Sequence, residues 1–353
     1  MGQTRRMDAS ADVGVTPGLD LAALRGYLDS AAPELLPGRL SAELIAGGRS
    51  NLTYRVRADG RDVVLRRPPL GHVLPTAHDM AREFRVISAL HPTGFPVPVP
   101  LHLCQDVGAL GVPFYLMSFV DGRVLRGKSE FESISPETAE RLGRLLVDTL
   151  ARLHAEDPDE IGLGDFGRPE GYLERQVRRW HQQWERSQTR ELPALEEVAE
   201  HLARTVPEPD RATIVHGDFR LDNVMVDRDA ERILAVLDWE MATLGAPLAD
   251  LGLLVVYTEL AEAGLAPTQP RYGPADGFPS AAQIVQRYGA ASGSDVDKVG
   301  WYVALGYYKL AIISEGIHAR FLQGKTVGEG FERMGRSVPL LVERARAALG
   351  SVA

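Results

Sequence analysis

Two segments that carry Asp and Asn at fixed spacing constrain this chain of 353 residues more than any other feature. The run IVHGDFRLDNVMVD covers residues 214–227, and the run ILAVLDWE covers residues 233–240. Asn223 follows Asp218 by five residues, and Asp238 follows Asn223 by fifteen. Asp and Asn also favour plain turns, but the His-Gly pair before Asp218 and the Leu-Asp-Trp-Glu run favour a functional loop.

Phosphoryl transfer is a chemistry that such a loop can serve. It needs a carboxylate beside the incoming hydroxyl, oxygen ligands for Mg²⁺, and cations on the phosphates. Asp218 suits the first need, and Asn223 with Asp238 suits the second. The Asp-x-x-x-x-Asn interval is also that of the protein-kinase catalytic loop, where a second Asp follows later on a strand edge.

The periodicity changes along the chain. Leu52, Tyr54 and Val56 alternate with polar residues, which predicts a half-buried strand. The segment Ala58-Asp59-Gly60 predicts a hairpin turn into the next strand. Helical spacing predicts helices at 20–31, 77–90, 137–154, 172–186, 194–205, 299–322 and near 338–349. A mostly β portion therefore precedes a mostly helical one, which indicates an α+β fold in two lobes.

His216-Gly217-Asp218 with Asn223, followed by Leu237-Asp238-Trp239-Glu240, resembles the aminoglycoside phosphotransferase and choline kinase superfamily. The stretches VVLRRPP, REFRVISAL and GVPFYLMSFVDGR are similar to the phosphotransferase domains related to those fused to acyl-CoA dehydrogenases. The resemblance covers roughly residues 40–325 and implies a protein-kinase-like fold, with a small antiparallel sheet lobe and a helical lobe. It divides the chain into an N-terminal extension and helix (1–39), a nucleotide-binding lobe with the hinge (40–120), and a helical lobe with the catalytic loop and acceptor site (121–353).

The resemblance also implies roles for individual residues. Asp218 would orient the substrate hydroxyl and accept its proton, while Asn223 and Asp238 would hold Mg²⁺. ATP would be bound by a phosphate-covering loop, a cation with its carboxylate partner, and the hinge, through Gly47, Gly48, Ser50, Asn51, Arg66, Glu83, Ser118 and Val120.

Arg66 departs from the family pattern, in which a lysine is usual. Arginine is always charged and can bind phosphate through two nitrogens, but its planar head is bulkier than an ammonium group. Strand alternation places Arg66 on the face of Val64 and Arg67 on the face of Val63 and Leu65. If Arg66 binds phosphate, it should lie within hydrogen-bond reach of Glu83 or the nucleotide. The departure leaves open a second class, a catalytically weak nucleotide-binding or regulatory module.

Further polar residues have competing interpretations. His216 is expected to be a hydrogen bonder that shapes the loop, and Asp222 to be exposed beside it. Asp250 is interpreted as a helix N-cap or as a support of the catalytic loop. Four polar residues on the predicted helix 299–322 either face an acceptor site or are solvated: Lys309, Glu315, His318 and Arg320.

Composition excludes several classes. The net charge of −9 argues against a nucleic-acid partner. No stretch approaches the roughly 18 apolar residues of a membrane span, the N-terminus lacks the apolar run of a secretory signal, and one cysteine forms no intrachain disulfide, so a cytoplasmic location is expected. No Ala-Pro-Glu motif follows Asp238, which disfavours a protein kinase. The expected partner is a small molecule with a hydroxyl acceptor. The family resemblance suggests a hydroxyacyl-type metabolite, with an aminoglycoside as the less favoured alternative, and the oligomeric state stays open.

Overall fold

The computed structural model describes residues 17–45, 51–70, 78–126, 128–265, 272–326 and 330–350. The chain divides into two compact units. One consists of Met1–Phe84 and Val99–Phe119, and the other of Arg85–Pro98 and Val120–Ala353. The three-part division expected from the sequence, at 1–39, 40–120 and 121–353, stays a prediction about function.

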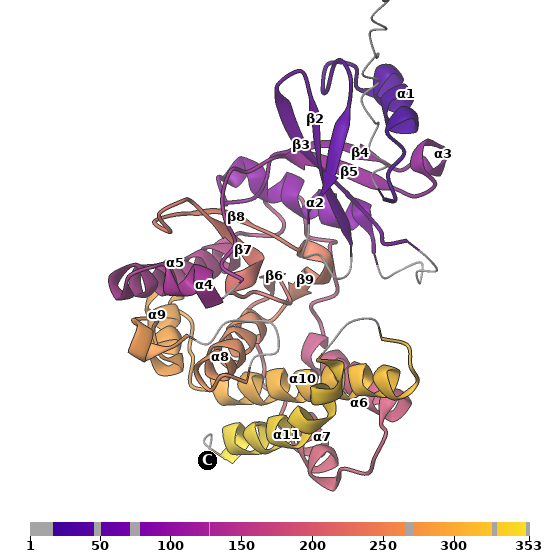
Figure 1. Cartoon of the computed structure of the whole chain (residues 1–353). Helices are drawn as coiled ribbons and strands as arrows, with labels where there is room; N and C mark the ends of the chain where they lie inside the picture. The colour runs from indigo at the N-terminus through magenta and orange to yellow at the C-terminus, as the bar shows by residue number, and fades with distance from the viewer. Residues whose placement is uncertain are drawn as a thin grey trace, which may run out of the picture. The chain divides into compact units, whose positions relative to one another are not determined.

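The first unit is built on a five-stranded antiparallel sheet (Figure 1). Its strand order is β1-β2-β3-β5-β4. The strands and helices of this part of the chain are β1 (Ser41–Leu44), β2 (Leu52–Ala58), β3 (Arg61–Arg67), β4 (Pro100–Cys104), β5 (Phe114–Ser118), α1 (Leu21–Ala31), α3 (Val107–Leu110) and α2 (Met80–Leu90), which passes into the second unit after Phe84. The predicted hairpin joins β2 to β3 at Asp59 and Gly60.

Helix α1 covers one face of this sheet with an apolar core. Asp20 caps the helix, because its carboxylate accepts the backbone N–H groups of Ala22 and Ala23. Leu24 and Leu28 are fully buried against the sheet side chains of that face. Burying each such leucine contributes about 1.5–3 kcal/mol to the stability of the fold.

The two faces of the sheet differ as strand alternation predicted. Val63 and Leu65 belong to the core under α1, and Arg67 is buried on that face, where Nη1 donates to the carbonyl of Gly18 at 2.5 Å. Arg66 lies on the other face, with its strand partners Thr53 and Tyr115 beside it. The parity that separated Arg66 from Arg67 is thereby confirmed.

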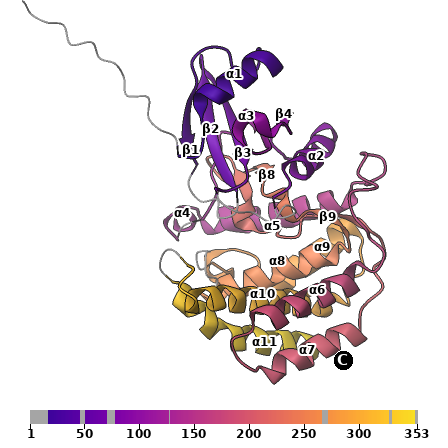
Figure 2. The ribbon, with the colours of Figure 1, turned by 90° about the vertical axis from the view of Figure 1, so that its right-hand side faces the viewer.

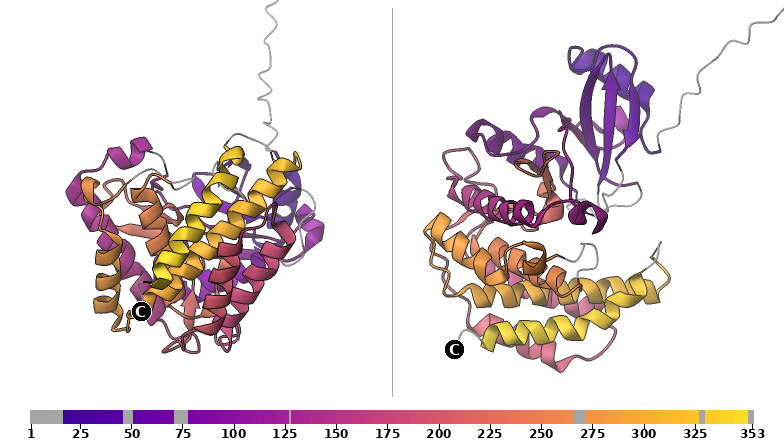
Figure 3. Two further views of the ribbon diagram at one scale, coloured as in Figure 1. Left: turned by 90° about the horizontal axis from the view of Figure 1, so that it is seen from below. Right: turned by 60° about the vertical axis from the view of Figure 1, so that its left-hand side comes forward.

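The second unit is mostly helical. Its longer helices are α5 (Pro136–Ala155), α6 (Tyr172–Ser187), α7 (Pro193–Arg204), α8 (Leu248–Glu262), α9 (Ala281–Ser292), α10 (Val299–Leu322) and α11 (Met334–Gly350), and α4 (Lys128–Glu132) is short. Helices α10 and α11 pack along each other (Figure 3) and against α6 and α7 (Figure 2). Two small antiparallel pairs join β6 (Thr213–Val215) to β9 (Thr243–Gly245) and β7 (Val224–Val226) to β8 (Ile233–Val236).

Helix α8 crosses α10 at a glycine. A Cβ atom on Gly252 would lie 2.6 Å from the carbonyl carbon and 2.7 Å from the carbonyl oxygen of Tyr302 on α10. Those atoms belong to the helix backbone, so a side chain could be admitted only by moving α8 away from α10. The close crossing fixes α8, and with it the polar residues that α8 carries.

We expect Gly252→Ala to lower the free energy of unfolding by about 1–3 kcal/mol, because the added methyl group overpacks the helix crossing. Gly316→Ala on α10 is the matched control, since its Cβ would meet only Ser187, at 3.8 Å. The control should be neutral or more stable than wild type by up to about 1 kcal/mol, because alanine favours a helix. Urea unfolding followed by far-UV circular dichroism measures both, and equal stabilities of the two variants would contradict the crossing.

Candidate active site

The loop that follows β6 is held by a buried carboxylate. Asp250 accepts the backbone N–H of His216 at Oδ2 (2.6 Å) and the backbone N–H of Gly217 at Oδ1 (2.8 Å). Only 1% of Asp250 is exposed. The loop backbone is thus fixed directly before Asp218.

Asp250 is not the N-cap of α8. The helix begins at Leu248, so Asp250 lies in its first turn and its carboxylate serves the loop instead. The Nε2 atom of His154, on α5, lies 3.3 Å from Asp250 Oδ2, and the other ring nitrogen lies 2.7 Å from the Tyr288 hydroxyl. Burial raises the pKa of Asp250, but the hydrogen bonds from His154 and from the backbone of His216 outweigh it, so the pKa is lowered.

His216 is a hydrogen bonder of the loop, as the sequence predicted, and it also joins two parts of the site. Its Nδ1 accepts the backbone N–H of Asp218 at 3.3 Å, so Nε2 carries the proton that it donates to the carbonyl of Leu237 at 2.9 Å. The ring is fully buried and lies 4.7 Å from that of Trp239. His216 therefore connects the loop of Asp218 to the segment of Asp238.

Asp218 is held at both carboxylate oxygens yet stays partly accessible. Oδ1 accepts the hydroxyl of Tyr257 at 2.7 Å, and Oδ2 accepts the side-chain amide of Asn223 at 3.1 Å. The Nε atom of Arg220 lies 3.5 Å from Oδ2, and 27% of the Asp218 side chain is exposed. A carboxylate that is both oriented and accessible suits a group that receives a proton from an incoming hydroxyl.

Two cations lie near Asp218, Arg220 and Lys309. The sequence did not predict that either of them contacts this loop. Arg220 pairs with Asp222 at 2.9 Å and stacks over the ring of Tyr257 at 4.9 Å. Asp222 is buried, with 6% exposure, so the prediction of an exposed residue was wrong; its pairing with Arg220 compensates the burial. Lys309 on α10 donates to the carbonyl of Gly217 at 2.9 Å. Burial lowers the pKa of Lys309, against the raising effect of Asp218.

Asn223 and Asp238 are brought together by the pairing of β7 with β8. The backbone N–H of Leu237 donates to the carbonyl of Asn223 at 2.8 Å, and Asp238 is the next residue. The Asn223 amide nitrogen faces the acceptor atoms of Asp218, so the side-chain oxygen is the atom that could bind a metal. Asp238 has φ 66° and ψ 61°, a left-handed backbone that is uncommon for a residue with a side chain and recurs at functional sites.

These two oxygen donors fit Mg²⁺. This cation prefers carboxylate and amide oxygens and is usually held by one or two protein ligands, with phosphate oxygens and water completing its shell. In the described part of the chain, no group of three or more His, Cys, Asp or Glu side chains is placed to hold a metal. The pair Asn223 and Asp238 is of the kind that binds magnesium together with a nucleotide.

The first unit holds the cation that the sequence proposed for phosphate. Arg66 Nε donates to Glu83 Oε2 at 2.8 Å, so the predicted pairing of Arg66 with Glu83 is confirmed. Glu83 is 2% exposed and also accepts the Tyr115 hydroxyl at 3.1 Å and the Asn51 amide at 3.0 Å. Glu83 therefore is not a solvated helix residue, and it fixes the guanidinium of Arg66.

The remaining predicted nucleotide contacts are placed as follows. Gly47, Gly48 and Ser50 lie outside the described residues. The backbone N–H of Ser118 donates to Val99 at 2.8 Å, and the carbonyl of Val120 accepts from Gly122 at 3.0 Å. The nucleotide-binding roles of these residues stay predictions.

Glu315 does not face a site. It is fully buried and accepts from the Thr189 hydroxyl and from Arg190, whose Nη2 lies at 2.7 Å, so it joins α10 to the segment between α6 and α7. Arg320 is exposed near the end of α10, and Lys309 alone of the four polar candidates on this helix contacts the loop before Asp218.

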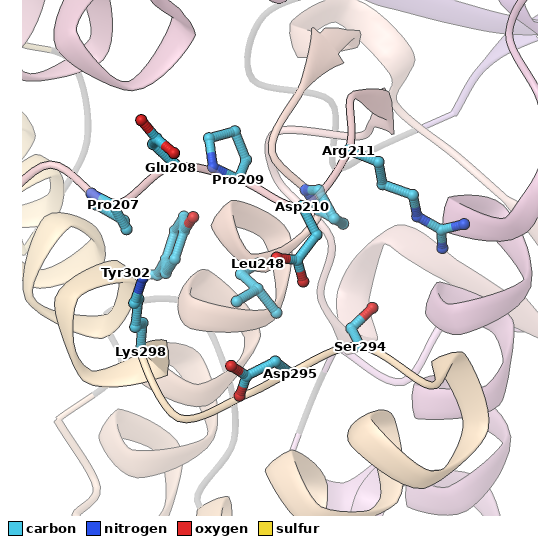
Figure 4. Close-up of a pocket in the computed structure, with 11 residues that line it drawn as sticks. Pro207, Glu208, Pro209, Asp210, Arg211, Leu248, Ser294, Asp295, Lys298 and Tyr302 are labelled. Atoms are coloured by element: carbon cyan, nitrogen blue, oxygen red, sulfur yellow. The ribbon is translucent and has the colours of Figure 1, made fainter.

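A separate pocket of the second unit does not coincide with this chemistry (Figure 4). Its lining includes Asp210, Arg211, Leu248, Asp295 and Tyr302, and none of the residues that contact Asp218. The contacts around Asp218, and not this hollow, therefore define the candidate active site.

The sheet unit, the helical unit and the Asp218 loop define a kinase-like phosphotransferase fold. The chain belongs to the phosphotransferase enzyme family, whose model matches residues 41–284. The α+β fold class predicted from the sequence is confirmed, and so is the resemblance to this family. Among the described helices, none is long and apolar enough to cross a membrane.

Relatives and solved structures agree on the family. The chain is 36% identical over 319 residues to acyl-CoA dehydrogenase family member 11 of Gallus gallus, covering 88% of this chain but 41% of that protein. It is 33% identical to family member 10 of Mus musculus, covering 92% of this chain and 30% of the relative. A solved Ralstonia eutropha structure, provisionally described as an aminoglycoside phosphotransferase, is 32% identical, with a TM-score of 0.80 over 94% of this chain and 98% of that one.

A more distant structure shares the fold alone. The spectinomycin phosphotransferase solved with ADP and spectinomycin is 15% identical, with a TM-score of 0.59 over 94% of this chain and 99% of that one. At this identity the likeness supports the architecture and leaves the acceptor to other arguments.

We expect Asp250→Asn to lower the free energy of unfolding at pH 7 by about 1–3 kcal/mol, since an amide nitrogen would face a buried N–H group. The folded-state pKa of Asp250 lies below its ordinary value of 3.8. Its contribution to stability is therefore present above pH 3.8 and is lost as the pH falls through the lower folded value. The difference between variant and wild type should shrink below pH 3.8 in urea unfolding. Asp297→Asn, at an exposed position, is the control; a difference that does not depend on pH would contradict the anchoring role of the charge.

Proposed function

We propose that this chain is an ATP-dependent phosphotransferase that moves the γ-phosphate to a hydroxyl group of a small molecule. The observation that carries the proposal is the Asp218 carboxylate, which is oriented by Tyr257 and Asn223 while 27% of its side chain stays exposed. Asn223 and Asp238 lie at the ends of the paired strands β7 and β8. The proposed base, Asp218, and the two proposed metal ligands are therefore neighbours.

Each residue then has a defined task. Asp218 orients the acceptor hydroxyl and takes its proton as the oxygen attacks the γ-phosphorus. Asn223 and Asp238 hold Mg²⁺, which when bound neutralises charge on the phosphate oxygens. Arg66, fixed by Glu83, binds phosphate oxygens of ATP with the geometry of a charged fork. Phosphate-covering N–H groups from residues 47–51 and hinge contacts at Ser118 and Val120 complete the proposed nucleotide site.

A hydroxyacyl-type metabolite is the acceptor class that we propose. Aminoglycosides are polycations that call for a strongly acidic site, and Arg220 and Lys309 offset part of the acidic charge around Asp218. The curated relatives carry acyl-CoA dehydrogenase names, and the chain spans less than half of their length, 41% of the Gallus gallus protein. An acyl metabolite with a hydroxyl group fits both observations.

A catalytically weak nucleotide-binding module is the second candidate. Arg66 in place of the usual lysine favours it. Asp218, Asn223 and Asp238 argue for the enzyme, because a module that has lost catalysis has no need to keep the base and both metal ligands in contact distance of one loop.

We expect Asp218→Asn to lower kcat about 10²-fold or more, because the amide cannot accept the hydroxyl proton. Turnover is measured as ADP release from Mg·ATP with a panel of hydroxyacyl-CoAs, hydroxy acids, amino alcohols and aminoglycosides. Asp229→Asn, at an exposed position beyond β7, is the control and should match wild type. Near-normal turnover of Asp218→Asn would remove the proposed base.

We expect Arg66→Ala to weaken Mg·ATP binding by roughly 10- to 100-fold, the value of a charge-assisted hydrogen bond. Arg66→Lys should retain part of the affinity, because it keeps the charge but loses the fork.

Asp238→Ala should remove the dependence of ATP binding on Mg²⁺. Calorimetric titration measures all three, with Arg61→Ala at the exposed start of β3 as control. If Arg66→Ala bound Mg·ATP with unchanged affinity, Arg66 would have no role in binding phosphate, and the catalytically weak nucleotide-binding module would be favoured.

A further inference from the structure

The two oxygens of the Asp218 carboxylate have different surroundings. Oδ2 accepts the Asn223 amide at 3.1 Å and has Arg220 Nε at 3.5 Å. Oδ1 has a single partner in the part of the chain that the structure describes, the Tyr257 hydroxyl at 2.7 Å. Each carboxylate oxygen has two lone pairs. Oδ2 faces the Arg220 cation, which disfavours a proton on that oxygen. Oδ1 faces the Tyr257 hydroxyl instead and keeps one direction for a further hydrogen bond.

Tyr257 can only donate in this contact. An ionised carboxylate accepts and does not donate, so the phenol must keep its proton. Burial, followed by the charge of Asp218, raises the pKa of Tyr257 well above its ordinary value, which keeps the phenol protonated. The hydroxyl is thus a fixed donor to Oδ1.

The ring of Tyr257 is also fixed in place. The guanidinium of Arg220 lies 4.9 Å from its centroid, a cation–π contact. Tyr257 follows Asp250 by two helical turns, so both side chains project from one face of α8. One face of α8 therefore holds the loop at two points. Asp250 accepts the backbone N–H of Gly217, and Tyr257 donates to the side chain of Asp218. Lys309 faces the same loop from α10 through the Gly217 carbonyl.

We propose that Tyr257 is a positioning residue that turns Asp218 so that Oδ1, and not Oδ2, receives the proton of the acceptor hydroxyl. The inference rests on the proposed function. In the step it describes, the acceptor oxygen bonds to the γ-phosphorus and the bond from that phosphorus to the β–γ bridging oxygen breaks. ADP leaves with the electron pair of that bond, and the hydroxyl proton passes to Oδ1.

The geometry also places the acceptor. Two groups that bond to the same carboxylate oxygen lie close to each other, so the acceptor hydroxyl approaches beside the Tyr257 hydroxyl. Tyr257 is consequently a wall of the acceptor site, and a phenylalanine there would keep the wall while removing the hydrogen bond.

The first experiment compares Tyr257→Phe with Tyr307→Phe in the full chain. Tyr307 is a matched control because its buried hydroxyl also donates to a carboxylate, that of Glu259. Glu259 lies on α8, as Tyr257 does. ADP release from Mg·ATP with water as the acceptor is the probe, together with calorimetric binding of Mg·ATP. We expect Tyr257→Phe to lower kcat roughly 10-fold with the KM for ATP unchanged, and Tyr307→Phe to keep the wild-type kcat. Wild-type or higher kcat in Tyr257→Phe would overturn the inference.

The second experiment separates positioning from a structural effect. If Tyr257 acts through Asp218, Tyr257→Phe should have no further effect on kcat in an Asp218→Asn background, because the oriented oxygen is already lost. A loss that multiplies with that of Asp218→Asn would overturn the inference while leaving the proposed function intact. A wild-type protein that binds no Mg·ATP, or whose turnover is independent of Asp218, would overturn the proposed function itself.

Discussion

The buried carboxylate of Asp250 is the interaction on which the position of the Asp218 loop depends. A charge that is 1% exposed is stable only when its partners replace water, and Asp250 has three: two backbone N–H groups and the ring of His154. These partners come from the loop that carries Asp218 and from α5, and Tyr288 of α9 extends the network through His154. One side chain on α8 thereby ties the loop to the helices around it, and so the position of Asp218 follows from helix packing.

A steric constraint acts together with this charge. Gly217 has φ +80°, and a Cβ atom there would lie 2.9 Å from the backbone oxygen of Met241. Only glycine admits that conformation and that approach without strain. The loop of Asp218 can therefore lie against the turn Trp239–Met241, which follows Asp238. The His-Gly-Asp order of the sequence reflects this: one residue bonds Leu237, the next permits the approach, and the third carries the carboxylate.

The sequence predicted those features that depend on local pattern. Residues 299–322 were predicted as a helix with the bounds that α10 has, and the spacing of Asp218, Asn223 and Asp238 indicated a loop with a strand-ending Asp near it. The pairing of β7 with β8 was not predicted. The last helix begins at Met334, earlier than predicted, because Pro339 does not interrupt its first turns. Asp222 and Tyr257 were beyond reach, since the burial of one depends on Arg220 and the role of the other on α8 facing the loop. A polar ring inside the apolar run 251–257 was the one available signal for Tyr257.

The arginine at position 66 has a physical explanation in the first unit. Glu83 is nearly inaccessible and accepts donors from Arg66, Tyr115 and Asn51, so its charge is satisfied by a network rather than by one ammonium group. An arginine has three nitrogens to share among such partners, whereas a lysine has one. The hydroxyl of Thr53, its strand partner, accepts from Nη1 of Arg66 at 3.5 Å. The departure from the family's lysine is thus accompanied by neighbours that fit an arginine, which argues for a retained role rather than for decay.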